Sequence, residues 1–280
     1  MIKIVTDSTC NLSPEVIRRH DLRIAPITIQ FGTQSYQEGI DIDRALFYRT
    51  IEERQIIPST SQPTPAWFAR FFEELHALGH EILVITVTGE HSGTYSSAML
   101  AKSMVPQAAV DVFDSRSISL GTGWMVLEAA HMAERWSGRE AILARLAHIR
   151  DRGQLFLTPA TLKYLQMSGR VGKLQGAIAS LLNVKPIIAL KAGQLDAREN
   201  VRTRGRALER LLELLGESLG TQVPLNMAVI HAEVREEALA LAARVRAKFN
   251  VRELLIEDLV ISLAVHGGPG VIGVFGYPIG

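Results

Sequence analysis

The feature that most constrains this chain is the alternation, through its first half, of short apolar runs with helix-type patterns. The expected strands cover residues 2–6, 81–87 and 110–113, and the expected helices cover residues 65–78, 120–136 and 140–150. Strands that alternate with helices pair in parallel, because each helix carries the chain back to the start of the next strand. The first half therefore predicts an α/β domain built on a parallel sheet.

The pattern changes after about residue 152. Residues 185–190 and 195–201 flank the turn sequence Lys191-Ala192-Gly193-Gln194, which predicts a β-hairpin. Further expected elements are helices at 203–219 and 235–248 and strands at 225–231, 252–257 and 271–275. A hairpin mixed with helices indicates a mixed sheet. We therefore expect an N-terminal α/β domain over residues 1–152 and a C-terminal α+β domain over residues 153–280.

Composition excludes several classes of protein. The chain has 280 residues, 47% of them hydrophobic, and a formal net charge of +1, so nothing indicates a nucleic-acid partner. Its one cysteine, Cys10, cannot form an internal disulfide, which fits a reducing compartment. Asp7 interrupts the opening apolar run, unlike in a signal peptide, and no apolar stretch reaches the roughly 18–20 residues of a membrane span. We expect a soluble, cytoplasmic protein.

The sequence contains no complete motif of a common cofactor site. Residues 268–273 have the spacing G-x-G-x-x-G, but no helix and no later acid follow them, so they do not predict a dinucleotide site. Residues 169–174 lack the Ser or Thr and the first glycine of a phosphate loop. The eight histidines show no metal-ligand spacing, and Ser92 is not in a G-x-S-x-G elbow. We expect no cofactor and no metal.

What remains is a set of hydroxyl-rich segments beside the expected strands. They are Asp7-Ser8-Thr9, residues 58–63, residues 92–97, and Asp114-Ser115 with Ser117 and Ser119. Loops after the carboxyl ends of parallel strands meet at one edge of the sheet. These hydroxyls and nearby helix N-terminal amides would then face one anionic group. The alternative is that they serve only as helix caps and turns.

Seven segments together resemble a known family. IVTDSTCNLS, PSTSQPTP, HSGTYSSA, DSRSISLGTG, LKYLQMSGRVGK, KPIIALKAG and VHGGPGVIG occur in the order and spacing of the DegV family, across essentially the whole chain. The resemblance implies two domains with an acyl chain held between and within them. It also implies a non-catalytic, fatty-acid-binding subunit of a two-component kinase, whose ATP-dependent partner subunit phosphorylates the bound acid to an acyl phosphate. The expected ligand is a long-chain fatty acid such as palmitate or oleate.

The resemblance also assigns residues. The ligand-binding positions it implies are Thr60, Ser61, Ser92, Gly93, His266 and Gly267, and the positions near the pocket mouth and the kinase are Arg202, Arg170 and Lys173. Two positions depart from the family pattern: His91 stands where an apolar residue is usual, and Gly267 where alanine is common.

Each assignment has an ordinary alternative. Thr60 is also a reasonable turn residue, Ser92 a helix cap, and His266 a packed core side chain. Arg202, together with the nearby arginines 170, 198, 204 and 206 and Lys173, forms either a solvated face or a docking surface for the kinase or an anionic membrane. Cys10 is expected to be a small buried residue, and Gly268 and Gly270 to permit a tight turn or a close approach.

Physical chemistry sets what such a site must supply. Burying a tail of about 14–18 carbons at roughly 0.8 kcal/mol per methylene gives about 10 kcal/mol before ordering costs. The carboxylate then needs donors, which hydroxyls and a protonated histidine provide. No motif of this chain could hold ATP, which favours a separate kinase.

Two other classes stay open at this point. A serine hydrolase would use Ser92 and His266 with Asp7 or Asp114 as the orienting acid. A regulatory module would bind some other small anionic ligand in a pocket too short for a long tail.

Overall fold

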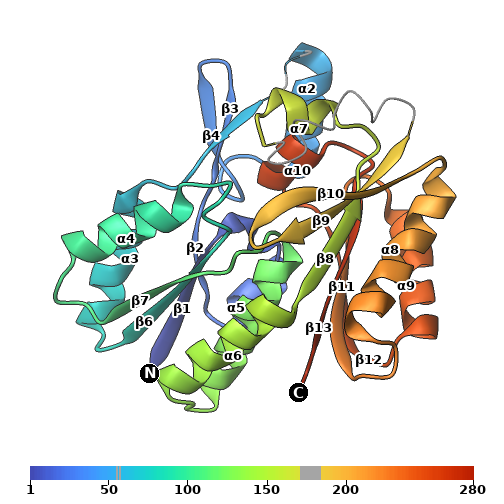
Figure 1. Ribbon diagram of the computed structural model, residues 1–280. Coiled ribbons are helices and arrows are strands. Elements are labelled where there is room, and N and C mark those ends of the chain that lie inside the picture. Colours follow the sequence, from blue (N-terminus) through green and yellow to red (C-terminus); the bar gives the residue numbers. More distant parts are fainter. Residues whose placement is uncertain (55, 57, 171–183) are drawn as a thin grey trace. The chain divides into compact units, whose positions relative to one another are not determined.

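The computed structural model describes residues 1–54, 56, 58–170 and 184–280, apart from the side chain of Glu52, and contains two compact units (Figure 1). Unit 1 comprises Met1–Arg150 together with Val260–Ser262, and unit 2 comprises Asp151–Leu259 together with Leu263–Gly280. The division into an N-terminal domain of residues 1–152 and a C-terminal domain of residues 153–280 stays a prediction. Among the described residues, no helix has both the length and the apolar character to cross a bilayer.

The first sheet of unit 1 is the expected parallel one. Its strands β1 (Ile2–Asp7), β2 (Arg23–Ala25), β6 (Glu81–Thr86) and β7 (Val110–Asp114) lie in the order β2-β1-β6-β7. The three longer strands were predicted. β2 was missed because three residues are too few to show a periodicity.

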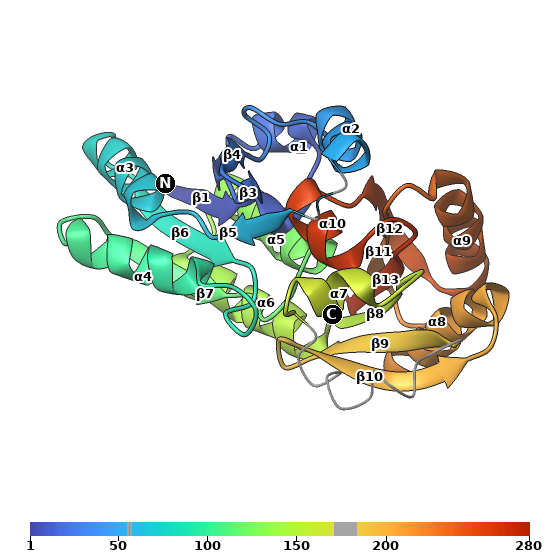
Figure 2. The same cartoon turned by 90° about the horizontal axis from the view of Figure 1, so that it is seen from above.

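Helices cover both faces of this sheet. α3 (Pro65–Ala77) and α4 (Thr94–Met104) lie side by side on one face, and α5 (Leu120–Glu134) packs on the other (Figure 2). α5 is buried along nearly its whole length, and a β-carbon added to Gly123 would lie 2.3 Å from the carbonyl oxygen of Cys10. Glycine at this position therefore lets α5 approach the loop after β1. Two further helices of the unit are α1 (Pro14–Arg19) and α6 (Arg139–Arg152), and α6 reaches the start of unit 2.

A second, antiparallel sheet of unit 1 was not predicted. It contains β3 (Thr28–Phe31), β4 (Gln34–Gln37) and β5 (Ser59–Ser61), in the order β4-β3-β5, and α2 (Arg44–Arg54) lies between β4 and β5 in the chain. The segment PSTSQP, interpreted as a turn, thus contains a short strand. Serine and threonine gave it no apolar alternation to signal a strand.

Unit 2 has the mixed sheet that the hairpin indicated. The strands are β8 (Gln154–Thr158), β9 (Lys185–Lys191), β10 (Gln194–Val201), β11 (Leu225–His231), β12 (Val251–Asp258) and β13 (Ile272–Pro278), in the order β10-β9-β8-β13-β11-β12. β11 and β12 are parallel and the other neighbours are antiparallel. α8 (Arg204–Leu219) and α9 (Arg235–Lys248) pack on the sheet through a leucine-rich core, and two short helices, α7 (Lys163–Met167) and α10 (Ile261–Gly267), complete the described elements.

Candidate ligand-binding site

The loops at the carboxyl edge of the parallel sheet are joined by hydrogen bonds. After β6, the Val87 amide donates to the Asp7 carboxylate at 2.9 Å, and the Thr88 amide donates to the carbonyl of Ser117 at 2.9 Å. The Gly89 amide donates to Asp114 at 3.2 Å. The loops after β1, β6 and β7 are therefore connected to one another.

Asp7 is the centre of this loop cluster. Its Oδ1 accepts the Thr9 amide at 3.0 Å and the Thr9 hydroxyl at 2.5 Å, while Oδ2 accepts the Val87 amide. Burial raises the pKa of this carboxyl above its ordinary value, and the three hydrogen bonds act in the opposite direction. Asp7 and Asp114, the two candidates for the orienting acid of a hydrolase, both accept hydrogen bonds from loop backbone.

The segment that contains Thr60 reaches the Ser92 loop. A β-carbon added to Gly93 would lie only 2.8 Å from Gln62 Nε2, so the glutamine side chain packs directly over Gly93. Thr60 and Ser61 precede Gln62 in β5, where Thr60 pairs with Ile29 and both hydroxyl residues are half-buried. The structure thus brings together two of the four predicted hydroxyl segments, residues 58–63 and 92–97. Sequence reasoning missed Gln62, whose only signal was its place inside PSTSQP.

Ser92 lies at the start of α4. Its Oγ is 2.8 Å from the Thr94 hydroxyl and accepts the Thr94 amide at 3.3 Å, and Gly93 is the helix N-cap. The capping interpretation of Ser92 therefore has direct support. The hydroxyl is half-buried, and its part in ligand binding stays a prediction.

Two other buried hydroxyls in this region can form further hydrogen bonds. Within the part of the chain that the structure describes, Thr86 Oγ1 at the end of β6 and Ser119 Oγ before α5 are buried with no hydrogen-bond partner. Ser119 also has a φ of +52°, which is rare for a residue with a side chain. Such hydroxyls can bind a ligand or a water molecule.

His266 and Gly267 end α10 and are half-buried. The glycines after them are required by geometry. Gly268 has a φ of +72°, and a β-carbon there would lie 2.2 Å from the Tyr164 ring. The expectation of a tight turn with a close approach is thereby met at Gly268, which faces Tyr164.

Two arginines of the predicted basic group are paired with acids. Arg204 forms an ion pair with Glu237 at 2.5 Å and donates to the carbonyls of Thr158 and Gly270. Arg206 pairs with Glu209 and Glu213 on its own helix. Both charges are therefore compensated, because acids follow these arginines at helical spacing or lie on the neighbouring helix α9.

The remaining predicted cations differ in environment. Arg202 is exposed, and Arg170 is half-buried and donates to the carbonyl of Ser168 at 2.7 Å. Lys173 lies outside the described residues. Cys10 is 1% exposed, and burial raises the pKa of its thiol to about 12, as expected for a packed thiol. The described residues contain no cluster of histidine, cysteine or acids able to hold a metal.

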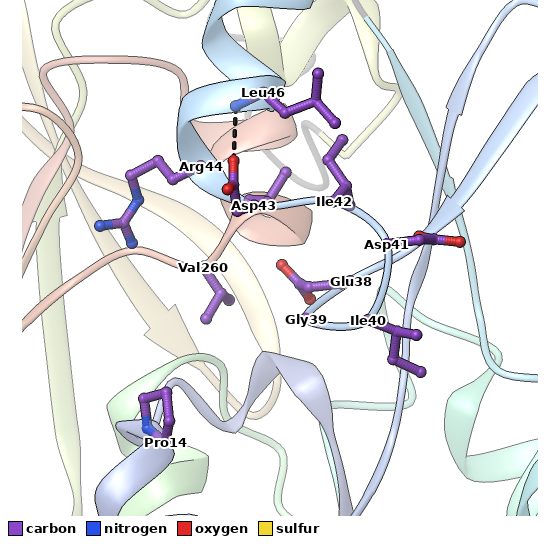
Figure 3. A pocket seen from close by; sticks show the side chains of 11 residues that line it. Pro14, Glu38, Gly39, Ile40, Asp41, Ile42, Asp43, Arg44, Leu46 and Val260 are labelled. Atoms are coloured by element: carbon purple, nitrogen blue, oxygen red, sulfur yellow. Dashed lines mark hydrogen bonds between the residues drawn. The ribbon is translucent and has the colours of Figure 1, made fainter.

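Unit 1 also contains a pocket of about 520 Å³ beside the loop between β4 and α2 (Figure 3). It is lined by residues 38–44, Leu46, Pro14, Val260 and Ile261. Asp43 on its wall accepts the Leu46 amide at 2.7 Å and so stabilises the start of α2. The pocket borders Glu38, a buried carboxyl that no motif had indicated.

Comparison with known proteins decides the family. The model of the DegV family, described as an uncharacterised protein family, matches residues 1–278. This chain belongs to the DegV family. Protein DegV of Bacillus subtilis is 32% identical over 274 residues, which cover 98% of each chain.

Solved DegV structures have the same fold. A DegV family protein of Thermus thermophilus, described in terms of fatty acid binding, has a TM-score of 0.93 at 31% identity, covering 99% of each chain. Bacillus subtilis DegV, described as a fatty acid binding protein, has a TM-score of 0.90 at 32% identity, again covering 99% of each chain. A stearic acid-binding protein of Eubacterium ventriosum has a TM-score of 0.91 at 29% identity and covers 99% of this chain and 98% of its own.

Proposed function

We propose that this DegV family member binds one long-chain fatty acid in the cytoplasm and presents its carboxylate to a separate ATP-dependent kinase. The observation that carries the proposal is the likeness, along 99% of the chain, to two DegV proteins described as binding fatty acids, each above 30% identity. The protein itself is the carrier, and the phosphoryl transfer belongs to the partner.

The assigned ligand residues are those that the resemblance implied. In unit 1 these are Thr60, Ser61, Ser92 and Gly93, and the packing of Gln62 on Gly93 supports their joint action. His266 and Gly267 are proposed to contribute from α10. A carboxylate that accepts bonds from hydroxyls and a histidinium keeps much of the stabilisation it had in water.

The first test is direct. Protein purified under native conditions, denatured and extracted, should release close to one equivalent of fatty acid detectable by mass spectrometry. Delipidated protein should bind palmitate or oleate, with affinity that rises with tail length. An affinity that does not depend on tail length would favour a regulatory module that binds another small anionic ligand. A protein without any affinity for these acids would exclude the proposal.

A second test concerns the head group. Thr60→Val keeps the side-chain shape and removes the hydroxyl, so it should weaken fatty-acid binding by roughly tenfold, the cost of one hydrogen bond to a charged group. Ser59→Ala, one residue earlier in β5 and exposed, is the matched control. Equal affinity of the Thr60 variant and wild type in competition with a fluorescent acid would remove Thr60 from the site.

A third test concerns the kinase. Arg202→Ala should leave fatty-acid affinity intact and slow phosphorylation of the bound acid by the partner kinase. Arg206→Ala is the matched control, because Arg206 is also exposed but is held by two glutamates. Equal rates for both variants and wild type would place the kinase contact elsewhere.

A further inference from the structure

Glu38 is a buried carboxyl bound entirely by neutral donors. Its exposure is 7%, and it accepts hydrogen bonds from the Ser8 hydroxyl at 2.5 Å, the Ser262 hydroxyl at 2.6 Å and the Ser262 amide at 2.7 Å. Burial raises its pKa above the ordinary value, and the bonds from Ser262 and Ser8 lower it. A carboxyl in this setting has a specific geometric role, because a buried acceptor is stable only while its donors stay in place.

The bonds join segments that are distant in the chain. Ser8 follows β1, and its Oγ also accepts the Ile27 amide at 3.0 Å. Asn11, in the same loop, accepts the Val260 amide at 2.9 Å through Oδ1. Glu38 and Asn11 thus hold residues 260–262, the three late residues that pack with unit 1.

Those residues are the entry to α10. Ser262 is in the first turn of this helix, where backbone amides have no acceptor within the helix. Glu38 takes that amide and the neighbouring hydroxyl together, so it fixes both the position and the rotation of the first turn. His266 follows one turn later in the same helix, and side chains four residues apart lie on one helix face.

The entry to α10 lies beside the pocket of unit 1. The pocket of about 520 Å³ borders Val260 and Ile261 as well as Glu38 (Figure 3). The hydrogen bonds to Glu38 therefore hold the start of α10 at the place where it borders the pocket.

We propose that Glu38 is the positioning residue for His266: by binding Ser262 through two donors it orients α10, and so directs the imidazole toward the fatty-acid carboxylate. The direction of the imidazole toward a fatty-acid carboxylate rests on the proposed function. The orientation of α10 by Glu38 is a property of the protein without ligand.

The ligand-free protein gives the first readout. In protein labelled with ¹⁵N-histidine, Glu38→Gln should shift the imidazole signals of His266, identified by their loss in His266→Ala, and change their pH titration. Asp41→Asn is the matched control, since Asp41 lies in the same loop and lines the same pocket but accepts the Gln37 amide. Ser262→Ala should reproduce the effect of Glu38→Gln. His266 signals identical to wild type in a folded Glu38→Gln protein would overturn the proposal.

Affinity gives the second readout. Glu38→Gln should weaken palmitate binding by about tenfold in the wild-type background and by less than about twofold in the His266→Ala background, because residues that act through one another are not additive. Equal losses in both backgrounds would also overturn the proposal. Tryptophan fluorescence checks the fold of each variant, since all three tryptophans lie in unit 1. If wild type binds no fatty acid, the proposed function fails, and the histidine spectra still decide the role of Glu38.

Discussion

The buried carboxyl groups of unit 1 and the surface carboxylates on the helices of unit 2 are stabilised in different ways. In unit 1, Asp7 and Glu38 are buried and accept bonds from hydroxyls and backbone amides. In unit 2, glutamates of α8, α9 and β10 lie at the surface and pair with Arg204, Arg206 and Arg210. The first arrangement fixes loops around a proposed site, whereas the second strengthens a helix and its neighbours.

This difference shows where the geometry of the hydrogen-bond donors must be strictly defined. A buried carboxylate with neutral donors is stable in one geometry, because any donor that moves leaves an unsatisfied group. Arginine pairs at the surface tolerate movement, since water replaces a lost partner. In unit 1 such constraints lie at Asp7, which ends the parallel strand β1, and at Glu38, which follows the antiparallel strand β4.

The largest expected effect is at Asp7. Asp7→Ala leaves the Thr9 and Val87 amides and the Thr9 hydroxyl without their acceptor, and should lower the free energy of unfolding of unit 1 by about 3 kcal/mol or more. Denaturant unfolding followed by tryptophan fluorescence measures it, because the tryptophans report on unit 1. Asp7→Asn keeps one acceptor and should lose less. A loss below about 1 kcal/mol for Asp7→Ala would contradict the central place given to Asp7.

The next effect tests whether a partly buried ion pair of unit 2 depends on its geometry as the buried carboxyl groups of unit 1 do. Arg204 is partly buried and bonds two carbonyls besides Glu237, so Arg204→Ala should cost unit 2 about 2 kcal/mol. Hydrogen exchange of the β8 and β13 amides is the suitable measurement. Glu237→Gln, which keeps the two carbonyl bonds, is the control and should cost less. Equal costs would show that the ion pair, rather than the carbonyl bonds, carries the stability.

The dependence of the free energy of unfolding on pH gives a further test of this comparison. Burial holds the pKa values of Asp7 and Glu38 above their ordinary values, so as pH rises from about 4 the folded state keeps protons that the unfolded state has lost. The free energy of unfolding of unit 1 should then fall with rising pH, by up to about 1.4 kcal/mol per pH unit for each proton.

Unit 2 should respond with the opposite sign. Bonds from Arg210 and Arg206 lower the pKa values of Glu199 and Glu213, so the stability they give is present above about pH 4.5 and is lost as pH falls through the lowered values. Tryptophan fluorescence for unit 1 and hydrogen exchange for unit 2 separate the two slopes. Asp21, whose pKa Lys3 lowers, opposes the trend in unit 1, so the decisive quantity is the slope that Asp7→Asn removes. An unchanged slope in that variant would reject this account.

The smallest effect is expected on the outer face of α8. Arg206→Gln breaks exposed pairs with Glu209 and Glu213 and should shift the unfolding midpoint of unit 2 less than any change above. The shift should shrink further in high salt. A shift as large as that of Arg204→Ala would erase the distinction between the two arginines.

Periodicity predicted the elements that bury a regular face. The longer parallel strands, the hairpin and the helices α3, α5, α6, α8 and α9 followed from alternation and helical spacing, because burial imposes those patterns. The antiparallel strands β3, β4 and β5 did not, since they are three or four residues long and partly polar.

Long-range contacts limited prediction of the site. The hydroxyl loops were identified, and the family resemblance named residues in them, but Glu38 carries no local signal. Its partner Ser262 is 224 residues away, and the short helix α10 begins at that contact. The acid that pairs with Arg204 lies on another helix and is visible only once the helices are placed, whereas the acids that pair with Arg206 follow it at helical spacing.

The return of residues 260–262 to unit 1 has a consequence for dissecting the protein. No single cut separates the two units, since a fragment that stops at residue 150 lacks the Ser262 donors of Glu38 and the Val260 donor of Asn11. Such a fragment would lose three of the hydrogen bonds that these two buried side chains accept. A workable truncation would have to splice the late tripeptide back.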